Sequence, residues 1–240
     1  MVRVHAGQLN MISIIIPTYN EAGNIKELIE RIENCLSESH ELIIIDDASP
    51  DQTAKIAEEL ARKFPIKVIR RLGKLGLASA VLTGFRAASG DLLCVMDSDL
   101  SHPPEIIPAL LENLKTKNAD IVVASRFIEG SGIENWPKLR RLNTALASLV
   151  VRPLTGVKDP MSGFFLLKRE TVQNINLVPR GYKILLEILV KAKYSSVFEF
   201  PFVFKDRICG KSKLNLKIYW EFVMQLFSLY AYKLGKCLKN

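Results

Sequence analysis

The first half of the chain alternates short aliphatic runs with segments of helical periodicity, and this alternation limits the fold more than any other feature. The predicted strands are residues 12–16, 42–46, 66–70, 92–96 and 120–124. The predicted helices between them are residues 24–36, 52–63, 77–88 and 104–116. Because parallel neighbours are joined by crossover helices, the pattern predicts an α/β protein with a parallel sheet covered by helices on both faces.

The turns that follow the strands carry most of the polar motifs of this half. They are residues 17–23, 47–51, 73–76 and 97–104. In an open parallel sheet the carboxyl ends of the strands lie at one edge, where such sheets bind their ligands. We therefore expect a single cleft that collects all four turns.

Two carboxylates, Asp97 and Asp99, directly follow the predicted strand 92–96. Like charges this close repel each other unless a cation or a proton relieves them, and a hard divalent ion shared with a substrate diphosphate is the usual solution. The pair therefore indicates a metal site, although an exposed acidic turn or a helix N-cap would use the same residues. The nearby His102 has no second histidine at ligand spacing, which favours a structural role.

The earlier turns suit a nucleoside. Pro17 and Tyr19 offer a flat apolar surface for a base, and a carboxylate at Asp46 or Asp47 can accept hydrogen bonds from the edge of that base. Lys74 lies in a glycine-flanked loop from which it can reach a phosphate. Taken alone, each of these segments also fits an ordinary solvated turn.

Four segments together are far more specific than any one of them. They are Pro17-Thr18-Tyr19-Asn20-Glu21, Asp46-Asp47-Ala48-Ser49-Pro50-Asp51, Arg71-Leu72-Gly73-Lys74-Leu75-Gly76-Leu77 and Asp97-Ser98-Asp99-Leu100-Ser101-His102-Pro103-Pro104. In order and spacing they resemble the inverting family 2 nucleotide-sugar glycosyltransferases of GT-A fold, whose Rossmann-like sheet is mostly parallel. The resemblance implies donor binding by Pro17, Tyr19, Glu21, Ile45, Asp46, Asp47, Lys74, Asp97, Ser98 and Asp99. It also implies Mg²⁺ or Mn²⁺ held by Asp97, Asp99 and Ser101.

Motifs of the second half narrow the resemblance to the polyprenyl-phosphate mannosyltransferases. They are Ser125-Arg126-Phe127, Arg140-Arg141, Asp159-Pro160-Met161-Ser162-Gly163-Phe164-Phe165, Gly181-Tyr182-Lys183, Glu187, Phe204-Lys205-Asp206-Arg207 and Gly210-Lys211-Ser212-Lys213-Leu214. The resemblance implies catalytic roles for Asp99, Arg126 and Arg207. It implies that Arg126, Arg140, Arg207 and Lys213 bind the acceptor phosphate. Some members carry Gln in place of Ser101, and others continue into transmembrane helices, which are not expected in this sequence.

The implied reaction transfers mannose from GDP-mannose to a polyprenyl monophosphate, such as dolichyl phosphate, with inversion to a β-linked product. The alternative is the same fold with UDP-glucose or a UDP-N-acetylhexosamine as donor. A phosphate monoester, with a second pKa of about 6, is already largely ionised at neutral pH and attacks without a general base. Such an acceptor needs cationic anchoring instead, which favours arginine and lysine side chains.

Basic charge is concentrated at the end of the chain. The net charge is +8, and residues 201–240 hold eight basic side chains against two acidic ones. Residues 216–234 form an apolar and aromatic helical segment that Glu221, Gln225 and Lys233 interrupt, which favours a helix lying in a membrane interface over one that spans it. A core-packing or oligomer-forming helix is the alternative. Because no recognised nucleic-acid-binding motif accompanies the charge, we expect no nucleic-acid partner. A noncatalytic nucleotide-binding protein with the same fold is a further alternative to the enzyme.

One catalytic domain over residues 1–214 is predicted, with a nucleotide-sugar half over 11–126 and an acceptor half over 127–214. Residues 215–240 form the amphipathic segment. The four scattered cysteines and the absence of a long apolar stretch in residues 1–10 favour reduced thiols and no signal peptide. We therefore expect a protein at the cytoplasmic face of a membrane, either alone or with a membrane-anchoring partner protein.

Overall fold

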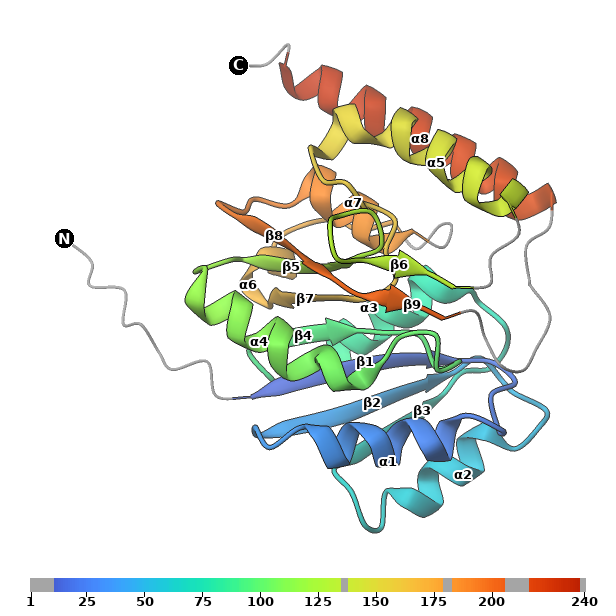
Figure 1. Ribbon diagram of the computed structural model, residues 1–240. Coiled ribbons are helices and arrows are strands. Elements are labelled where there is room, and N and C mark those ends of the chain that lie inside the picture. Colours follow the sequence, from blue (N-terminus) through green and yellow to red (C-terminus); the bar gives the residue numbers. More distant parts are fainter. Residues whose placement is uncertain (1–10, 135–137, 179–182, 206–215, 238–240) are drawn as a thin grey trace.

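A seven-stranded sheet flanked by helices forms the body of the protein, as seen in the computed structural model (Figure 1). The structure describes residues 11–134, 138–178, 183–205 and 216–237. The strands are β1 (Ile12–Thr18), β2 (His40–Asp46), β3 (Ile66–Arg70), β4 (Leu92–Val95), β5 (Ile121–Ser125), β6 (Gly132–Ile133), β7 (Phe165–Lys168), β8 (Val197–Pro201) and β9 (Val203–Phe204). The helices are α1 (Ile25–Cys35), α2 (Thr53–Leu60), α3 (Leu77–Ala87), α4 (Ile107–Thr116), α5 (Lys138–Thr155), α6 (Glu170–Gln173), α7 (Ile184–Lys191) and α8 (Leu216–Cys237), with a 3₁₀ turn at Pro104–Ile106.

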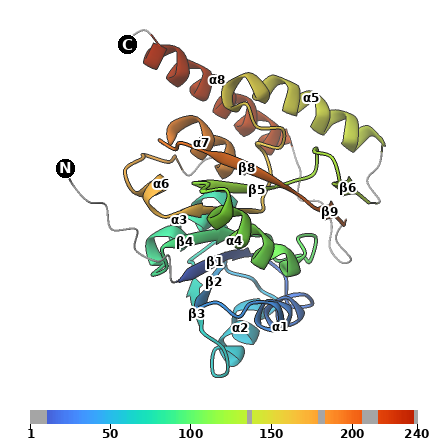
Figure 2. The same ribbon diagram turned by 60° about the vertical axis from the view of Figure 1, so that its left-hand side comes forward.

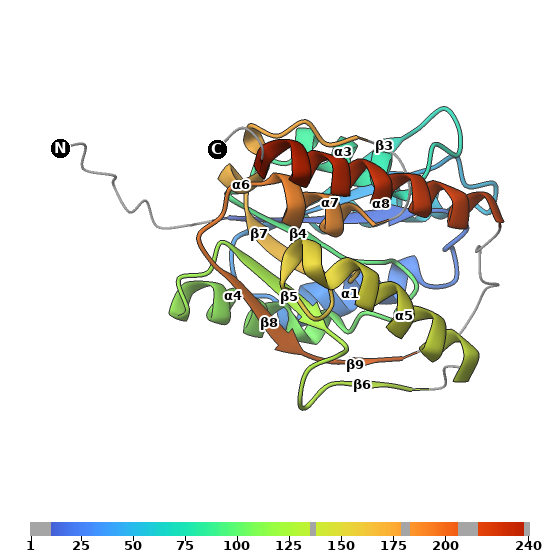
Figure 3. The same cartoon turned by 90° about the horizontal axis from the view of Figure 1, so that it is seen from above.

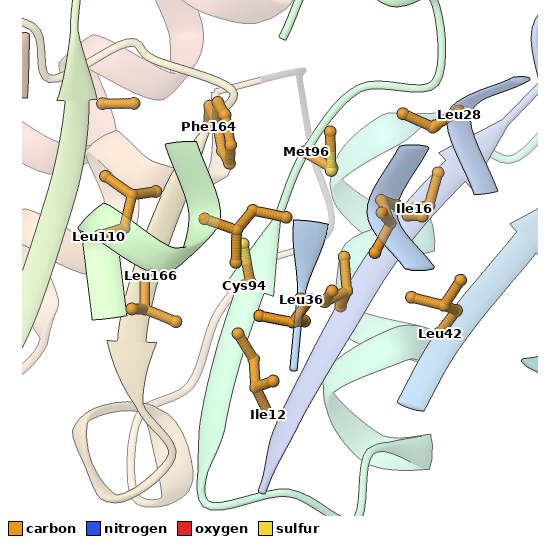
Figure 4. Close-up of a cluster of buried hydrophobic side chains, with 14 of the residues drawn as sticks. Ile12, Ile16, Leu28, Leu36, Leu42, Cys94, Met96, Leu110, Phe164 and Leu166 are labelled. Atoms are coloured by element: carbon orange, nitrogen blue, oxygen red, sulfur yellow. The ribbon is translucent and has the colours of Figure 1, made fainter. Parts of the chain in front are cut away.

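The strand order is β3-β2-β1-β4-β7-β5-β8, and every neighbouring pair is parallel except those that β7 makes. The predicted α/β class and mostly parallel sheet are therefore confirmed. Alternate residues of β1 face opposite sides, as strand geometry requires: Ile14 and Ile16 pack with α1 and α4, whereas Ile15 packs with α3 and α7. Figure 4 shows the first of these cores, with Ile12, Ile16, Cys94, Phe164 and Leu166 among its buried side chains.

Strand β7 was not predicted from the sequence. It runs antiparallel between β4 and β5, so a segment of the second half of the chain completes the sheet of the first half. Its four residues show no alternation of polar and apolar side chains because Phe165, Leu166 and Leu167 are all buried.

The remaining elements differ from expectation mainly at their ends. The extended segment 197–204 is divided at Phe202 into β8, which joins the main sheet, and β9, which pairs with β6 in a small second sheet. Strand β6 lies in the loop that follows β5. The described cysteines, Cys35 and Cys94, are free thiols, and burial raises the pKa of Cys35 to about 11.

Helices α5 and α8 form a third layer beyond α7, on the far side of the molecule from α1 and α2 (Figures 1 and 2). Seen from above, both helices cross the outer surface (Figure 3). Phe222 and Leu229 of α8 pack against Val151 and Leu154 of α5 in a separate apolar cluster. The Lys233 ammonium donates to the carbonyls of Pro153 and Leu154, which caps the carboxyl end of α5. Within the described ranges, no helix has both the length and the apolar character that crossing a bilayer demands.

Gly84 allows α3 to approach the sheet closely, because a Cβ there would lie 3.0 Å from Ile15 Cγ1 and Ile45 Cδ1. We expect Gly84→Ala to lower the free energy of unfolding by about 1–3 kcal/mol through overpacking, despite the better helix propensity of alanine. Chemical denaturation measures this loss. Gly235→Ala in α8 is the matched control, since nothing lies within 4 Å of that position. Equal stability of the two variants would contradict the close packing.

Candidate active site

The predicted turns meet at the carboxyl edge of the sheet. The Ser98 hydroxyl donates to the carbonyl of Pro17 at 3.0 Å, which joins the turns after β4 and β1. The backbone N–H of Asp47 donates to the Thr18 carbonyl at 3.0 Å, and the Gly76 N–H donates to Asp47 Oδ2 at 2.9 Å. The four turns therefore form one continuous rim, as expected from the sheet geometry.

Asp46 and Asp47 have different partners. The Asp46 carboxylate is buried and accepts hydrogen bonds from the Thr18 hydroxyl and from both the N–H and the hydroxyl of Ser49. It closes an Asx turn in which Ala48 has a positive φ of 58°. Asp47 instead faces the next turn of the rim, toward Gly76. Asp47 is also buried, so both carboxylates are engaged within the rim.

Arg71 holds Asp47 in place. Its position in the motif Arg71–Leu77 did not predict this role. Its Nη1 lies 2.7 Å from Asp47 Oδ1, with both side chains almost fully buried. Its guanidinium also donates to the Gly76 carbonyl and to Ser79. Gly76 has a φ of 94°, a conformation that favours glycine, so the loop that carries Lys74 closes onto this ion pair.

Tyr19 and Lys74 come together across the rim. The Lys74 Nζ lies 4.1 Å from the centroid of the Tyr19 ring, within cation–π range. Glu21 is buried and accepts a hydrogen bond from Asn24 at 2.9 Å. Ile45 is fully buried in the core beneath the turn, where its side chain packs with α3.

The acid pair has one accessible and one buried member. The Asp97 side chain is 38% exposed, whereas Asp99 is 7% exposed and accepts hydrogen bonds from the N–H and hydroxyl of Ser101. Among the residues with described positions, no cluster of three histidine, cysteine or acidic side chains could hold a metal. The predicted donor set of Asp97, Asp99 and the Ser101 hydroxyl consists of hard oxygen ligands, of the kind that Mg²⁺ and Mn²⁺ accept when water and a diphosphate complete the shell.

His102 lies behind Asp97. The Asp97 backbone N–H donates to His102 Nδ1 at 3.0 Å, and His102 Nε2 lies 3.7 Å from Asp97 Oδ2. Complete burial lowers the pKa of His102, in spite of the nearby Asp97 and Asp99 charges, and so favours the neutral ring. The structural role expected from the sequence is consistent with this position.

Arg126 forms a buried ion pair with Asp159. Its Nε and Nη2 each lie 2.8 Å from one Asp159 oxygen, and its backbone N–H donates to the same carboxylate at 3.0 Å. Burial alone would lower the pKa of Arg126, but Asp159, assisted by Asp97, outweighs burial and raises it. The guanidinium therefore stays charged, with its fork directed at Asp159.

The other predicted phosphate ligands are not placed. Arg207 and Lys213 lie outside the described residues, and Arg140 lies in α5 but its side chain is outside the described part of the structure. A cation that is placed near the acid pair is Lys183, which donates to the carbonyl of Met161 at 3.0 Å and contributes to the electrostatic environment of His102.

Residues 13–176 match the family described as glycosyl transferase family 2. The chain belongs to this family. It is 48% identical over 223 residues to the dolichol-phosphate mannosyltransferase of Pyrococcus furiosus, covering 91% of this chain but only 63% of that protein. It is 38% identical to the enzyme of the same name from Saccharomyces cerevisiae, covering 93% of this chain and 88% of the relative.

Solved structures support the same fold for this glycosyltransferase. Glucosyl-3-phosphoglycerate synthase from Mycobacterium tuberculosis, in complex with Mn²⁺, UDP-glucose and phosphoglyceric acid, matches with a TM-score of 0.68 at 21% sequence identity. The match covers 94% of this chain and 80% of that one. At this identity the likeness establishes the fold alone.

A separate hollow of about 770 Å³ lies at the opposite edge of the glycosyltransferase sheet. It is lined by Asp120, which precedes β5, by Glu170 of α6, by Leu189 of α7 and by the turn that follows α7, including Tyr194. Because β5 points its carboxyl end toward the other edge, this hollow lies away from the acid pair. It does not belong to the candidate active site.

The Arg126–Asp159 pair generates a stability prediction. We expect Arg126→Ala to lower the free energy of unfolding by about 3–5 kcal/mol, because removal of the cation leaves a buried carboxylate without its main partner. Arg31→Ala is the control: its pair with Glu105 is partly exposed, and the expected loss is below about 1 kcal/mol. Denaturant titration of both variants compares them. A loss at Arg126 no larger than that at Arg31 would contradict a structural role for this pair.

Proposed function

We propose that this glycosyltransferase transfers mannose from GDP-mannose to a polyprenyl monophosphate, such as dolichyl phosphate, with inversion to a β-linked lipid-phosphate mannose. The proposal rests on three relatives that align with nearly all of this chain and share the name dolichol-phosphate mannosyltransferase. One of them extends well beyond it, so donor, acceptor and membrane partner are part of the proposal. The division into a donor half and an acceptor half belongs to it as well.

The residues of the rim suit the donor. Tyr19 is assigned to the base and Lys74, which lies against the Tyr19 ring, to the phosphates, while Asp47, held by Arg71, is assigned to the base edge. Asp97 and Asp99, with Ser101, would hold Mg²⁺ or Mn²⁺, which neutralises charge on the leaving diphosphate when bound. The acceptor is already an anion, so these residues need not remove a proton from it.

The acceptor phosphate is assigned to basic residues of the second half. Arg126 keeps its charge in the buried pair with Asp159 and adds positive potential beside Asp97. Arg140, Arg207 and Lys213 complete the proposed phosphate site. Cationic groups are required there because two anionic substrates must approach each other closely.

The test is a product analysis. The purified protein is incubated with dolichyl phosphate in detergent and with labelled GDP-mannose, UDP-glucose or UDP-N-acetylglucosamine, and the lipid fraction is examined by mass spectrometry. We expect a hexose added only from GDP-mannose and released by mild acid. A lipid product formed from a UDP-sugar instead would replace the donor in the proposal, and no lipid product with any donor would reject it.

The same assay tests the acid pair. We expect Asp99→Ala and an excess of chelator each to reduce turnover by at least about a hundredfold, because the ion that balances the diphosphate is lost. Asp91→Ala, at the other end of β4 and exposed, is the control and should retain activity. Full turnover of the wild type in chelator would contradict the metal requirement.

The outer face of α8 supports contact with a membrane. Phe222 and Leu229 face inward, but a stripe at helical spacing faces outward. We call it the outer stripe; it consists of Trp220, Val223, Met224, Phe227 and Leu234. Each buried CH₂ contributes about 0.8 kcal/mol, so a polyprenyl chain does not leave the bilayer readily and the enzyme must approach it. We therefore assign core packing to the inner face of this helix and membrane contact to its outer stripe.

We expect the double variant Met224→Glu with Phe227→Glu to bind anionic vesicles at least about tenfold more weakly than the wild type, because it places charge on the inserted face. Ser228→Glu, an exposed neighbour off the stripe, is the control for one added negative charge, of which the double variant carries two. Cosedimentation with vesicles at low and high salt measures the effect. Equal binding of the wild type and the double variant would exclude the outer stripe as the membrane contact and favour a protein partner there.

A further inference from the structure

Both ring nitrogens of His102 face the same residue, Asp97. The Asp97 backbone N–H donates to Nδ1 at 3.0 Å, so Nδ1 carries no proton and the neutral ring holds its proton on Nε2. That Nε2–H faces Asp97 Oδ2 at 3.7 Å, within electrostatic contact but beyond hydrogen-bond length. One side chain thus meets both the backbone and the carboxylate of the exposed member of the acid pair.

Three phenylalanines fix the plane of the His102 ring. Phe164 stacks on it with the centroids 5.2 Å apart, and Phe202 and Phe204 meet it edge-on at 5.9 and 5.8 Å. These residues come from the segments around β7 and β9, far from His102 in sequence. The ring therefore has little freedom to turn its nitrogens away from Asp97.

Gly163 leaves the space that this arrangement needs. A Cβ at that position would lie 3.1 Å from His102 Cε1 and 3.2 Å from Asp97 Oδ2. The backbone of the loop before β7 therefore approaches the imidazole and the carboxylate together. Three separate segments converge on the orientation of one carboxylate.

We infer that His102 is a positioning residue, which holds the backbone of Asp97 through Nδ1 so that the carboxylate is ready to bind the divalent cation of the donor complex. The inference rests on the proposed function for the cation and the nucleotide. It gives His102 a part in cation binding, whereas the sequence predicted only a structural role for this residue. Groups that orient a ligand in this way commonly change metal affinity by about 10–100-fold when they are removed.

A purely structural histidine would make a different prediction. If His102 only fills space among phenylalanines, a phenylalanine in its place should preserve metal binding, because ring packing is kept. If the acceptor Nδ1 matters, asparagine should preserve metal binding better than phenylalanine does. Its Oδ1 occupies the place of Nδ1 and can accept a hydrogen bond from the Asp97 N–H. Asparagine, however, leaves a cavity between the rings and should be the less stable protein.

The experiment therefore compares His102→Phe, His102→Asn and His102→Gln in the full chain. The dissociation constant of GDP is measured by calorimetry with and without saturating Mn²⁺. The constant without Mn²⁺ divided by the constant with Mn²⁺ reports how strongly the metal enhances GDP binding. We expect the ratio to fall about tenfold or more in His102→Phe and in His102→Gln, which lacks the acceptor at Nδ1. In His102→Asn it should stay within about threefold of wild type although melting temperature falls furthest there.

A double-mutant comparison locates the effect on Asp97. In an Asp97→Asn background, His102→Phe should change the ratio no further, because the carboxylate that His102 positions is absent. The inference is overturned if His102→Phe keeps the wild-type ratio, or if the ratios follow the melting temperatures. It is overturned together with the proposed donor complex if Mn²⁺ does not strengthen GDP binding to the wild type. If binding responds to Mn²⁺ but no lipid product forms, the acceptor assignment fails and the inference about His102 stands.

Discussion

The arrangement of the active site depends on one buried carboxylate. Asp159 is fully buried and binds the side chain and the backbone N–H of Arg126, at the end of β5. Its own backbone N–H and that of Lys158 are held by the carboxylate of Glu199 in β8. The loop before β7 is thereby fastened on two sides, and this loop places Gly163 against Asp97. An unpaired carboxylate at this depth would cost several kcal/mol, so the contact is obligatory.

The acidic side chains at the carboxyl edge of the sheet divide into two groups. Asp46 and Asp159 are buried and join separate segments through hydrogen bonds, and the buried Glu21 accepts a hydrogen bond within its own turn. Asp97 differs, since more than a third of its side chain is open to solvent while its backbone is fixed by His102. Buried carboxylates thus make the surroundings of the accessible Asp97 rigid, as expected for a site that must bind a cation without first rearranging.

Much of this could be predicted from the sequence where the signal is local. The five strands of the first half, the turns after them and the helix beginning at Leu216 follow from periodicity within windows of ten to twenty residues. Pairings over long distances could not be predicted in this way. The partner of Arg126 lies 33 residues away, and Arg71 reaches Asp47 from a different turn. Strand β7 was missed because three buried apolar residues followed by Lys168 carry no periodic signal.

The antiparallel insertion of β7 has a consequence for the order in which the protein can form. Strands β4 and β5 do not touch each other in the finished sheet, because β7 lies between them and pairs with both. Residues 165–168 must therefore be synthesised before β5 can join β1 and β4 in one sheet. Strand β5 leaves the ribosome some forty residues earlier. Until then the apolar edges of β4 and β5 are unpaired. This places the period of greatest aggregation risk late in synthesis, when the chain is already two-thirds complete.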